Sequence, residues 1–132
     1  MLNRVFEKGQ LKCHQYWPIA TGDSMSFEDV GLTLENVHSV PGDHYTVRKF
    51  RLTDDDSGES REIEHYHYTT WPDFGVPQCP DTFLEFLRAV RASGSLAEDV
   101  GPPVVHCSAG IGRSGTFVLV DSCLVMVSPL IK

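Results

Sequence analysis

The feature that most constrains this chain is one uninterrupted stretch near its C-terminal end. It reads His106-Cys107-Ser108-Ala109-Gly110-Ile111-Gly112-Arg113-Ser114-Gly115. Five residues separate the cysteine from the arginine, and two of them are glycine. A loop this short can wrap around one phosphate group if successive backbone N–H groups point inward, and Gly110 and Gly112 permit the positive φ angles that such a turn needs. The stretch therefore predicts an anion-binding loop.

The side chains of this loop predict nucleophilic chemistry. A helix that begins near Arg113 to Gly115 would aim its positive dipole end at the anion, and Arg113 could bind two phosphate oxygens at once. The same surroundings would lower the pKa of the Cys107 thiol from about 8.5 to about 3.5–7.5. The Ser114 hydroxyl could bond the thiolate, and His106 could order the loop through the backbone. The alternative is a buried cysteine beside a glycine-rich turn.

A second motif offers a general acid. Asp73 lies within Trp71-Pro72-Asp73-Phe74-Gly75, where aromatic, proline and glycine neighbours indicate a stiff loop with a glycine pivot. Such a loop can close over an aromatic ring and exclude water. Alone, the motif indicates an ordinary turn. Together with a cysteine loop downstream, it favours an acid that protonates a leaving group opposite the thiolate.

The middle of the chain predicts strands. Alternating, β-branched and aromatic residues predict strands at 32–34, 45–52 and 61–70, the last with His65 and His67 on one face. The acidic connector 54–60 predicts a solvated turn that makes the last two strands a hairpin. A metal site at this connector, or zinc at the two histidines, are the alternatives.

Helices follow the strands. Apolar residues with helical spacing run from Phe83 to Val90, with Pro80-Asp81 suited to the start of a helix and Gly94 to its end. Residues 104–106 predict a short buried strand, and the apolar segment 116–126 predicts a buried helix. The fold class is therefore α/β (α+β): a twisted mixed sheet flanked by helices.

Composition limits the classes of function. The chain has 132 residues, of which 41% are hydrophobic and 22% charged, with a net charge of -7. These values predict one globular domain and argue against nucleic-acid or anionic-membrane partners. The four cysteines form no disulfide framework, and neither a signal peptide nor a membrane span is recognisable. We therefore expect the cytoplasm, or the cytoplasmic face of an endomembrane or the nucleus if a longer parent carries a targeting tail.

These motifs resemble the catalytic domain of tyrosine-specific protein tyrosine phosphatases, most closely the non-receptor type 1 and T-cell members. The resemblance covers residues 2 to about 126, whereas 127–132 are atypical. It is carried by the following stretches: Asn3-Arg4-Val5, Glu7-Lys8-Gly9, Leu11-Lys12-Cys13, Gln15-Tyr16-Trp17-Pro18, Tyr45-Thr46-Val47-Arg48, His67 to Pro77, Ser93-Gly94-Ser95-Leu96 and Val105 to Phe117.

The resemblance implies a role for each matching position. Cys107 would form a phosphocysteine, Asp73 would be the acid that later activates water, and Arg113 would clamp phosphate. Ser114 would assist thiolate departure. The remaining implied positions are Trp71, which packs near the arginine; Phe74, Ala109 and Ile111, which wall the tyrosine ring; Glu7, which orients the arginine; Lys12, which approaches the acid loop; and the loop residues Ser108, Gly110 and Gly112. The implied substrates are phosphotyrosine-containing proteins, and no metal or other cofactor is implied.

The resemblance also leads us to expect a partial domain, truncated at both ends. The loop that sets the depth of the phosphotyrosine pocket is expected before residue 1. The glutamine loop that positions hydrolytic water is expected after Met126, and no Gln follows Cys107. A cut sheet would expose apolar surface and strand edges, which lowers stability. The runner-up function is therefore an impaired or inactive phosphate-binding fragment. Another cysteine-arginine enzyme, acting on arsenate or phosphoserine, is a third hypothesis.

Overall fold

The structure is a computed structural model that describes residues 1–128. It contains two compact units, of which one comprises Met1–Cys13 and the chain from Tyr68 onward and the other comprises His14–His67. Of the atypical tail expected at 127–132, the last four residues lie outside the described part. The α/β class is confirmed, because both strands and helices form in the order that the sequence predicts.

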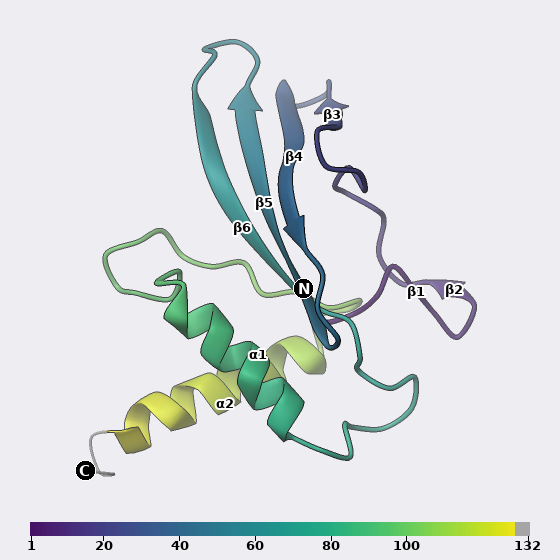
Figure 1. Ribbon diagram of the computed structural model, residues 1–132, viewed down its shortest axis with the longest axis vertical. Coiled ribbons are helices and arrows are strands. Elements are labelled where there is room, and N and C mark those ends of the chain that lie inside the picture. Colours follow the sequence, from purple (N-terminus) through teal and green to yellow (C-terminus); the bar gives the residue numbers. More distant parts are fainter. Residues whose placement is uncertain (129–132) are drawn as a thin grey trace. The chain divides into compact units, whose positions relative to one another are not determined.

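The unit His14–His67 is built on a four-stranded sheet with the order β3-β4-β5-β6 (Figure 1). β4 is antiparallel to both of its neighbours, so that Leu34 faces Met25 on one side and Leu52 on the other. All three predicted strands are confirmed, although the first extends well beyond its predicted end. β3 escaped prediction because it is short. The strands are β3 (Ser24–Phe27), β4 (Leu32–Val40), β5 (Tyr45–Asp54) and β6 (Ser60–Tyr68).

The acidic connector is the solvated turn that the sequence predicts. Residues 54–60 are exposed, and the Gly58 backbone N–H donates to the Asp54 carbonyl oxygen at 2.8 Å. Gly58 has a φ of +75°, a value that favours glycine. Within residues 1–128, no three histidine, cysteine or carboxylate side chains gather as a metal site would require.

The two strand histidines belong to the packing of this unit. Both are buried, and the Tyr16 hydroxyl lies 2.9 Å from Nε2 of His65. The Arg48 guanidinium lies over the Trp17 ring and 3.0 Å from Nδ1 of His67. Because a guanidinium can only donate, Nδ1 of His67 accepts and its proton is on Nε2. The ring nitrogen closest to Arg48 is therefore engaged in a protein hydrogen bond.

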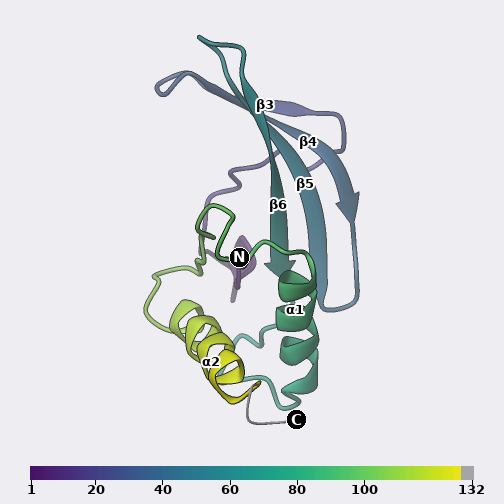
Figure 2. The same ribbon diagram turned by 90° about the vertical axis from the view of Figure 1, so that its left-hand side faces the viewer.

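The other unit contains the two short strands β1 and β2 (Figure 1) and the helices α1 and α2 (Figure 2). Helix α1 buries all four residues of its predicted apolar stripe, and Asp81 lies in its first turn. The helices are tied by two hydrogen bonds from Arg91 to the Asp121 carboxylate, at 2.6 and 2.7 Å. The elements are β1 (Phe6–Glu7), β2 (Gln10–Leu11), α1 (Asp81–Ala92) and α2 (Arg113–Val127).

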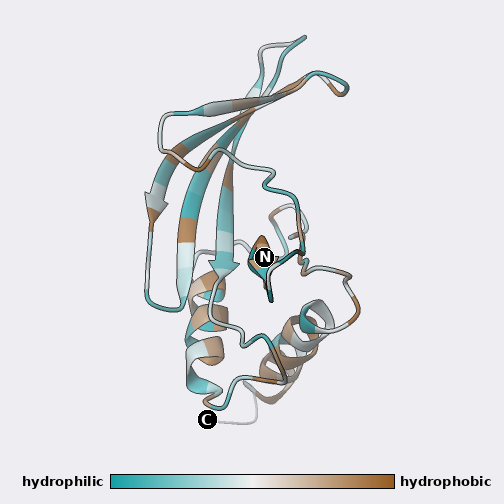
Figure 3. Cartoon of the chain, turned by 90° about the vertical axis from the view of Figure 1, so that its right-hand side faces the viewer, coloured by the Kyte–Doolittle hydropathy of each residue, from teal (hydrophilic) through white to brown (hydrophobic). Residues whose placement is uncertain are grey.

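Two expectations for this unit are wrong. Residues 104–106 form no strand, and Val104 is 86% exposed, because no other strand of residues 1–128 pairs with this segment. Helix α2 forms, and its sequence is largely apolar (Figure 3), yet only Ser114 and Phe117 are buried on it. Leu119 is 65% exposed. An apolar helical sequence does not say how many of its sides another element will cover.

No helix in the described range 1–128 has both the length and the apolar character needed to cross a bilayer.

Candidate active site

The loop from Cys107 to Gly112 leads directly into α2. Gly112 precedes the first helical residue, Arg113, so the N–H groups of the first helical turn open toward the loop. Gly110 has the expected positive φ, +75°, and a methyl group added there would meet no atom within 4 Å. Gly112 differs from expectation, because its φ is -132° and its ψ is -84°. The turn therefore uses one left-handed residue, not two.

The Cys107 thiol is acidified by its neighbours. Partial burial of the thiol by itself raises its pKa, but the dipoles of the nearby Ser114 hydroxyl and of the backbone N–H groups of Ser114, Gly110 and Gly112 outweigh that effect. Within residues 1–128 the buried Ser114 hydroxyl oxygen has no hydrogen-bond partner of good geometry, so its effect on the sulfur is that of a neighbouring dipole. The pKa falls from its ordinary 9.0 to about 7. About half of the sulfur is therefore thiolate at neutral pH, the form that attacks electrophiles.

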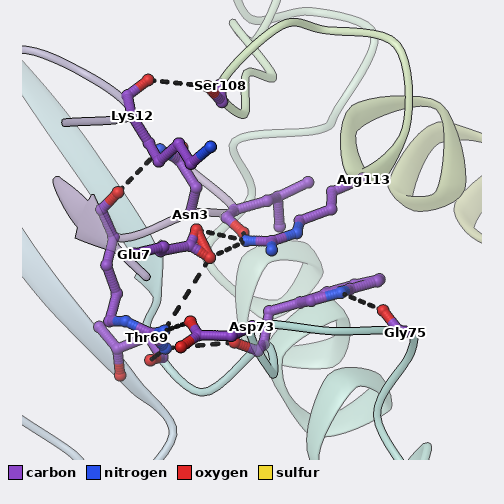
Figure 4. A network of polar contacts seen from close by, with 11 residues as sticks. Asn3, Glu7, Lys12, Thr69, Asp73, Gly75, Ser108 and Arg113 are labelled. Carbon is purple, nitrogen blue, oxygen red and sulfur yellow. Dashed lines mark hydrogen bonds and ion pairs between the residues drawn. The ribbon is translucent and has the colours of Figure 1, made fainter. Parts of the chain in front are cut away.

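Arg113 is held by groups from the N-terminal segment. Its Nη1 donates to the Glu7 carboxylate at 2.9 Å and to the Leu2 carbonyl oxygen at 3.1 Å (Figure 4). Glu7 is 5% exposed, so little water competes for this ion pair. The guanidinium carbon lies 5.2 Å from the centre of the Trp71 ring. Because Nη1 makes both bonds, the other N–H donors of the guanidinium face different directions.

The loop is anchored at two further points. The Ser108 hydroxyl donates to the Lys12 carbonyl oxygen at 2.9 Å (Figure 4), and the Leu2 backbone N–H donates to the His106 carbonyl oxygen at 3.0 Å. Nδ1 of His106 lies 3.2 Å from the Cys107 carbonyl oxygen. Burial lowers the pKa of His106, which favours the neutral ring at this place.

The loop at 71–75 adopts a compact turn. The Trp71 indole N–H donates to the Gly75 carbonyl oxygen at 3.2 Å, and Gly75 has a φ of +75°. The Asp73 carboxylate accepts a hydrogen bond from Arg4 at 2.6 Å. Phe74 is 79% exposed, and the Lys8 ammonium lies 3.7 Å from the centre of its ring. Cations of the N-terminal segment thus contact both Asp73 and its neighbour.

These elements enclose a pocket of about 220 Å³. It brings together Cys107, Arg113, Asp73, Glu7 and other residues that the sequence predicts. Five of the predicted residues lie outside the lining, although each belongs to, or lies next in sequence to, a segment that contributes to it. These are Trp71, Phe74, His106, Gly110 and Ser114. The full lining is Asn3, Glu7, Lys8, Lys12, Asp73, Cys107, Ser108, Ala109, Ile111, Gly112 and Arg113.

Sequence reasoning missed Asn3, Lys8 and Arg4 as site residues. Lys12, which the resemblance implies approaches the loop at 71–75, lines the pocket, and its ammonium lies 3.4 Å from the Gln10 side-chain oxygen. The lysine that contacts the loop at 71–75 is Lys8, in the turn between β1 and β2. Lys8 has a φ of +54°, which is uncommon for a residue other than glycine. The sequence gives little sign of this left-handed turn, because a lysine followed by glycine occurs in many other conformations.

The pocket is more cationic than the whole chain. Its lining includes Lys8, Lys12 and Arg113, against the carboxylates of Glu7 and Asp73, and both carboxylates are in ion pairs. The net charge of -7 is therefore compatible with an anion at this place, because distant surface charges are screened over about 8–10 Å. Chemically, the arrangement supplies a partly ionised thiol, an anion-binding loop, an arginine and a carboxyl group at one cavity.

Comparison with known proteins gives a consistent result. The family model described as protein-tyrosine phosphatase matches residues 1–129. Tyrosine-protein phosphatase non-receptor type 61F of Drosophila melanogaster is 54% identical over 129 residues, which is 96% of this chain and 24% of that protein. Human tyrosine-protein phosphatase non-receptor type 2 is 54% identical over 127 residues, and the rat protein of that name is 56% identical over 128. The chain spans 30% of each of these two.

Proposed function

The chain belongs to the protein-tyrosine phosphatase family, and we propose that it hydrolyses phosphotyrosine in proteins through a phosphocysteine intermediate. The observation that carries the proposal is the pocket that Cys107, Arg113 and Asp73 line together. The neighbours of the Cys107 thiol in this pocket lower its pKa to about 7. A thiolate at that place can attack a phosphorus atom held by the loop from Cys107 to Gly112.

In the proposed first step, the Cys107 sulfur attacks phosphorus, and the bond from phosphorus to the tyrosine oxygen breaks. Arg113 and the loop amides bind the equatorial oxygens, where charge is concentrated in the transition state. Asp73, in its protonated form, gives its proton to the departing phenolate. The Glu7 bond to Arg113 supports this arrangement, because it fixes the guanidinium plane.

In the proposed second step, water attacks the phosphocysteine and the thiolate leaves. Asp73, now ionised, removes a proton from that water. The Ser114 hydroxyl bonds the departing sulfur, which is supported by its contribution to lowering the Cys107 pKa. The proposed steps need no metal or organic cofactor, because the nucleophile, the acid and the phosphate-binding cation all come from side chains.

The proposed substrates are phosphotyrosine-containing proteins, and the proposed location is the cytoplasm or a cytoplasm-facing surface. The support is the names of the relatives, which describe non-receptor tyrosine-protein phosphatases. We propose neither nucleic acid nor membrane as a partner, in keeping with the net charge of -7.

The test is turnover of p-nitrophenyl phosphate by the purified chain. We expect Cys107→Ser to abolish turnover, because a hydroxyl is too weakly acidic to attack at neutral pH. Cys123→Ser is the matched control, because that thiol is exposed on α2 and should leave turnover unchanged within about twofold. Full activity of Cys107→Ser would refute the mechanism.

A second candidate function is phosphate binding without efficient turnover. One observation favours it: α2, whose first turn shapes the loop, leaves Leu119 and Met126 65% and 73% exposed. A helix with little cover holds its N-terminal turn less firmly. Binding of tungstate or inorganic phosphate by calorimetry, with no p-nitrophenyl phosphate turnover, would favour this function over hydrolysis.

A further inference from the structure

Arg4, to which the sequence analysis gives no role, makes three hydrogen bonds to the loop that carries Asp73 and to the residues before it. Its Nη1 donates to the Thr69 carbonyl oxygen at 2.9 Å and to the Trp71 carbonyl oxygen at 3.1 Å. Its Nη2 donates to the Asp73 carboxylate at 2.6 Å. One guanidinium therefore binds the main chain before and at the start of the loop and also the acid itself, and Figure 4 shows Thr69 and Asp73 side by side.

These contacts contribute little to the stability of the fold. Arg4 is 36% exposed and Asp73 is 41% exposed, and ion pairs with that much access to water are weak. The contacts do fix the position of the loop. Three hydrogen bonds from one planar guanidinium restrain both the distance of the loop from Arg4 and the orientation of the loop.

The chemistry of the acid makes that position important. In the proposed reaction, the Asp73 carboxyl group gives a proton to the phenolate oxygen and later takes one from water. The carboxyl group must therefore turn from Arg4 toward the leaving group in each cycle. The bonds to Thr69 and Trp71 do not involve the Asp73 side chain, so they can persist while Asp73 turns, and they keep the base of the loop in place.

We propose that Arg4 is the positioning residue of the acid loop, acting on leaving-group protonation through Asp73. The inference rests on the function proposed above. Lys8 contacts the loop at Phe74, one residue beyond the acid, through the ring face. Arg4 and Lys8 flank Glu7, which holds Arg113, so one short segment contacts both loops of the site.

The leaving group provides the decisive test. Phenyl phosphate releases a strongly basic phenolate that needs a proton, whereas 2,4-dinitrophenyl phosphate releases a weakly basic one that does not. We expect Arg4→Met to lower kcat for phenyl phosphate about tenfold or more and to change kcat for the dinitrophenyl ester less than about threefold, with KM nearly constant. Arg4→Lys should recover part of the loss.

A double variant separates positioning from general damage. If Arg4 acts through Asp73, then adding Arg4→Met to Asp73→Asn should lower phenyl phosphate turnover less than about twofold further. The matched control is Arg91→Met, which removes another arginine-carboxylate pair from the same unit and should leave both substrates unchanged. Equal slowing of the two esters by Arg4→Met would overturn the proposal.

Hydrogen exchange tests the inference independently of turnover. Amides at 71–76 should exchange about tenfold faster in Arg4→Met than in the unaltered chain, while Arg91→Met should leave them unchanged. If the unaltered chain hydrolyses no ester, the proposed function fails and this measurement still decides whether Arg4 holds the loop. Unchanged exchange at 71–76 would refute the positioning role.

Discussion

At the scale of single residues, the Cys107 sulfur shows how neighbouring dipoles outweigh burial. Burial raises the thiol pKa, yet the dipoles of Ser114, Gly110 and Gly112 beside the sulfur bring it down to about 7. Because the pKa of the Cys107 thiol is lower in the folded state than in the unfolded state, the folded chain holds this thiol proton less tightly than the unfolded chain does. The resulting stabilisation is present above the unfolded pKa near 9 and is lost as pH falls through about 7.

Ser114→Ala should raise the Cys107 pKa. It removes the hydroxyl dipole beside the sulfur, which can bond the thiolate once the thiolate has formed, and leaves the backbone N–H groups in place. A hydrogen bond to a charged group contributes about 1.5–3 kcal/mol, which corresponds to roughly one to two pKa units. The measurement is the rate of alkylation by iodoacetamide between pH 5 and pH 10, read by mass at Cys107. Ser128→Ala, at the opposite end of α2, is the control. An unshifted midpoint would contradict the assigned role of Ser114.

Glu7→Gln should weaken phosphate binding. Gln keeps the shape but not the charge that fixes Arg113 at 2.9 Å, and the variant leaves a partly buried cation without its counter-ion. We expect phosphate or tungstate affinity to fall about tenfold, measured by calorimetry. Glu35→Gln is the control, because Glu35 forms a comparable 2.9 Å pair with Arg51 in the other unit. Equal affinity in both variants would show that the Glu7 charge is dispensable.

At the scale of elements, the loop before α2 depends on one glycine. Gly110→Ala should slow turnover and destabilise the chain by about 1–2 kcal/mol, because φ +75° is strained for alanine. The cost would be purely a backbone cost, since the added methyl group meets no atom within 4 Å. Gly115→Ala makes the same addition within α2 and also meets none, so it should stabilise by about 0.5–1 kcal/mol.

Urea unfolding of these two variants gives the comparison. Opposite signs of the change in free energy of unfolding are expected. Similar losses from both substitutions would mean that the space around each glycine, and not the φ angle, decides the outcome.

At the scale of the whole molecule, α2 separates a buried side from an exposed one. Phe117→Ala should cost about 3–5 kcal/mol, because this ring is 5% exposed and packs against Phe83 and Phe86 of α1. Leu119→Lys should cost less than about 0.5 kcal/mol, because Leu119 is 65% exposed. It should also increase solubility, because it removes exposed apolar area. Chemical denaturation measures the change in the free energy of unfolding, and the protein concentration at saturation measures the change in solubility. A loss of several kcal/mol from Leu119→Lys would contradict the exposure of this face.

The sequence by itself determined the features that depend on neighbouring residues. The β4, β5 and β6 strands, the apolar stripe of α1 and the loop from Cys107 to Arg113 follow from local periodicity, from glycine and from hydrogen bonds that close over a few residues. Local patterns gave wrong predictions of burial, because burial depends on elements that are distant in the sequence. Val104 and Leu119 are apolar in sequence, but whether water reaches them depends on which elements lie beside them.

Only the tertiary structure decided how distant segments meet at the site. Glu7 reaches Arg113, Lys12 accepts from Ser108, and Arg4 binds the loop that carries Asp73, each across more than sixty intervening positions. No repeat or periodicity encodes such pairs, because each bond depends on the path of the whole backbone between its partners. The residues that surround the Cys107 thiol in its loop are thus local in sequence, whereas the orientation of the groups from other segments is a property of the folded unit.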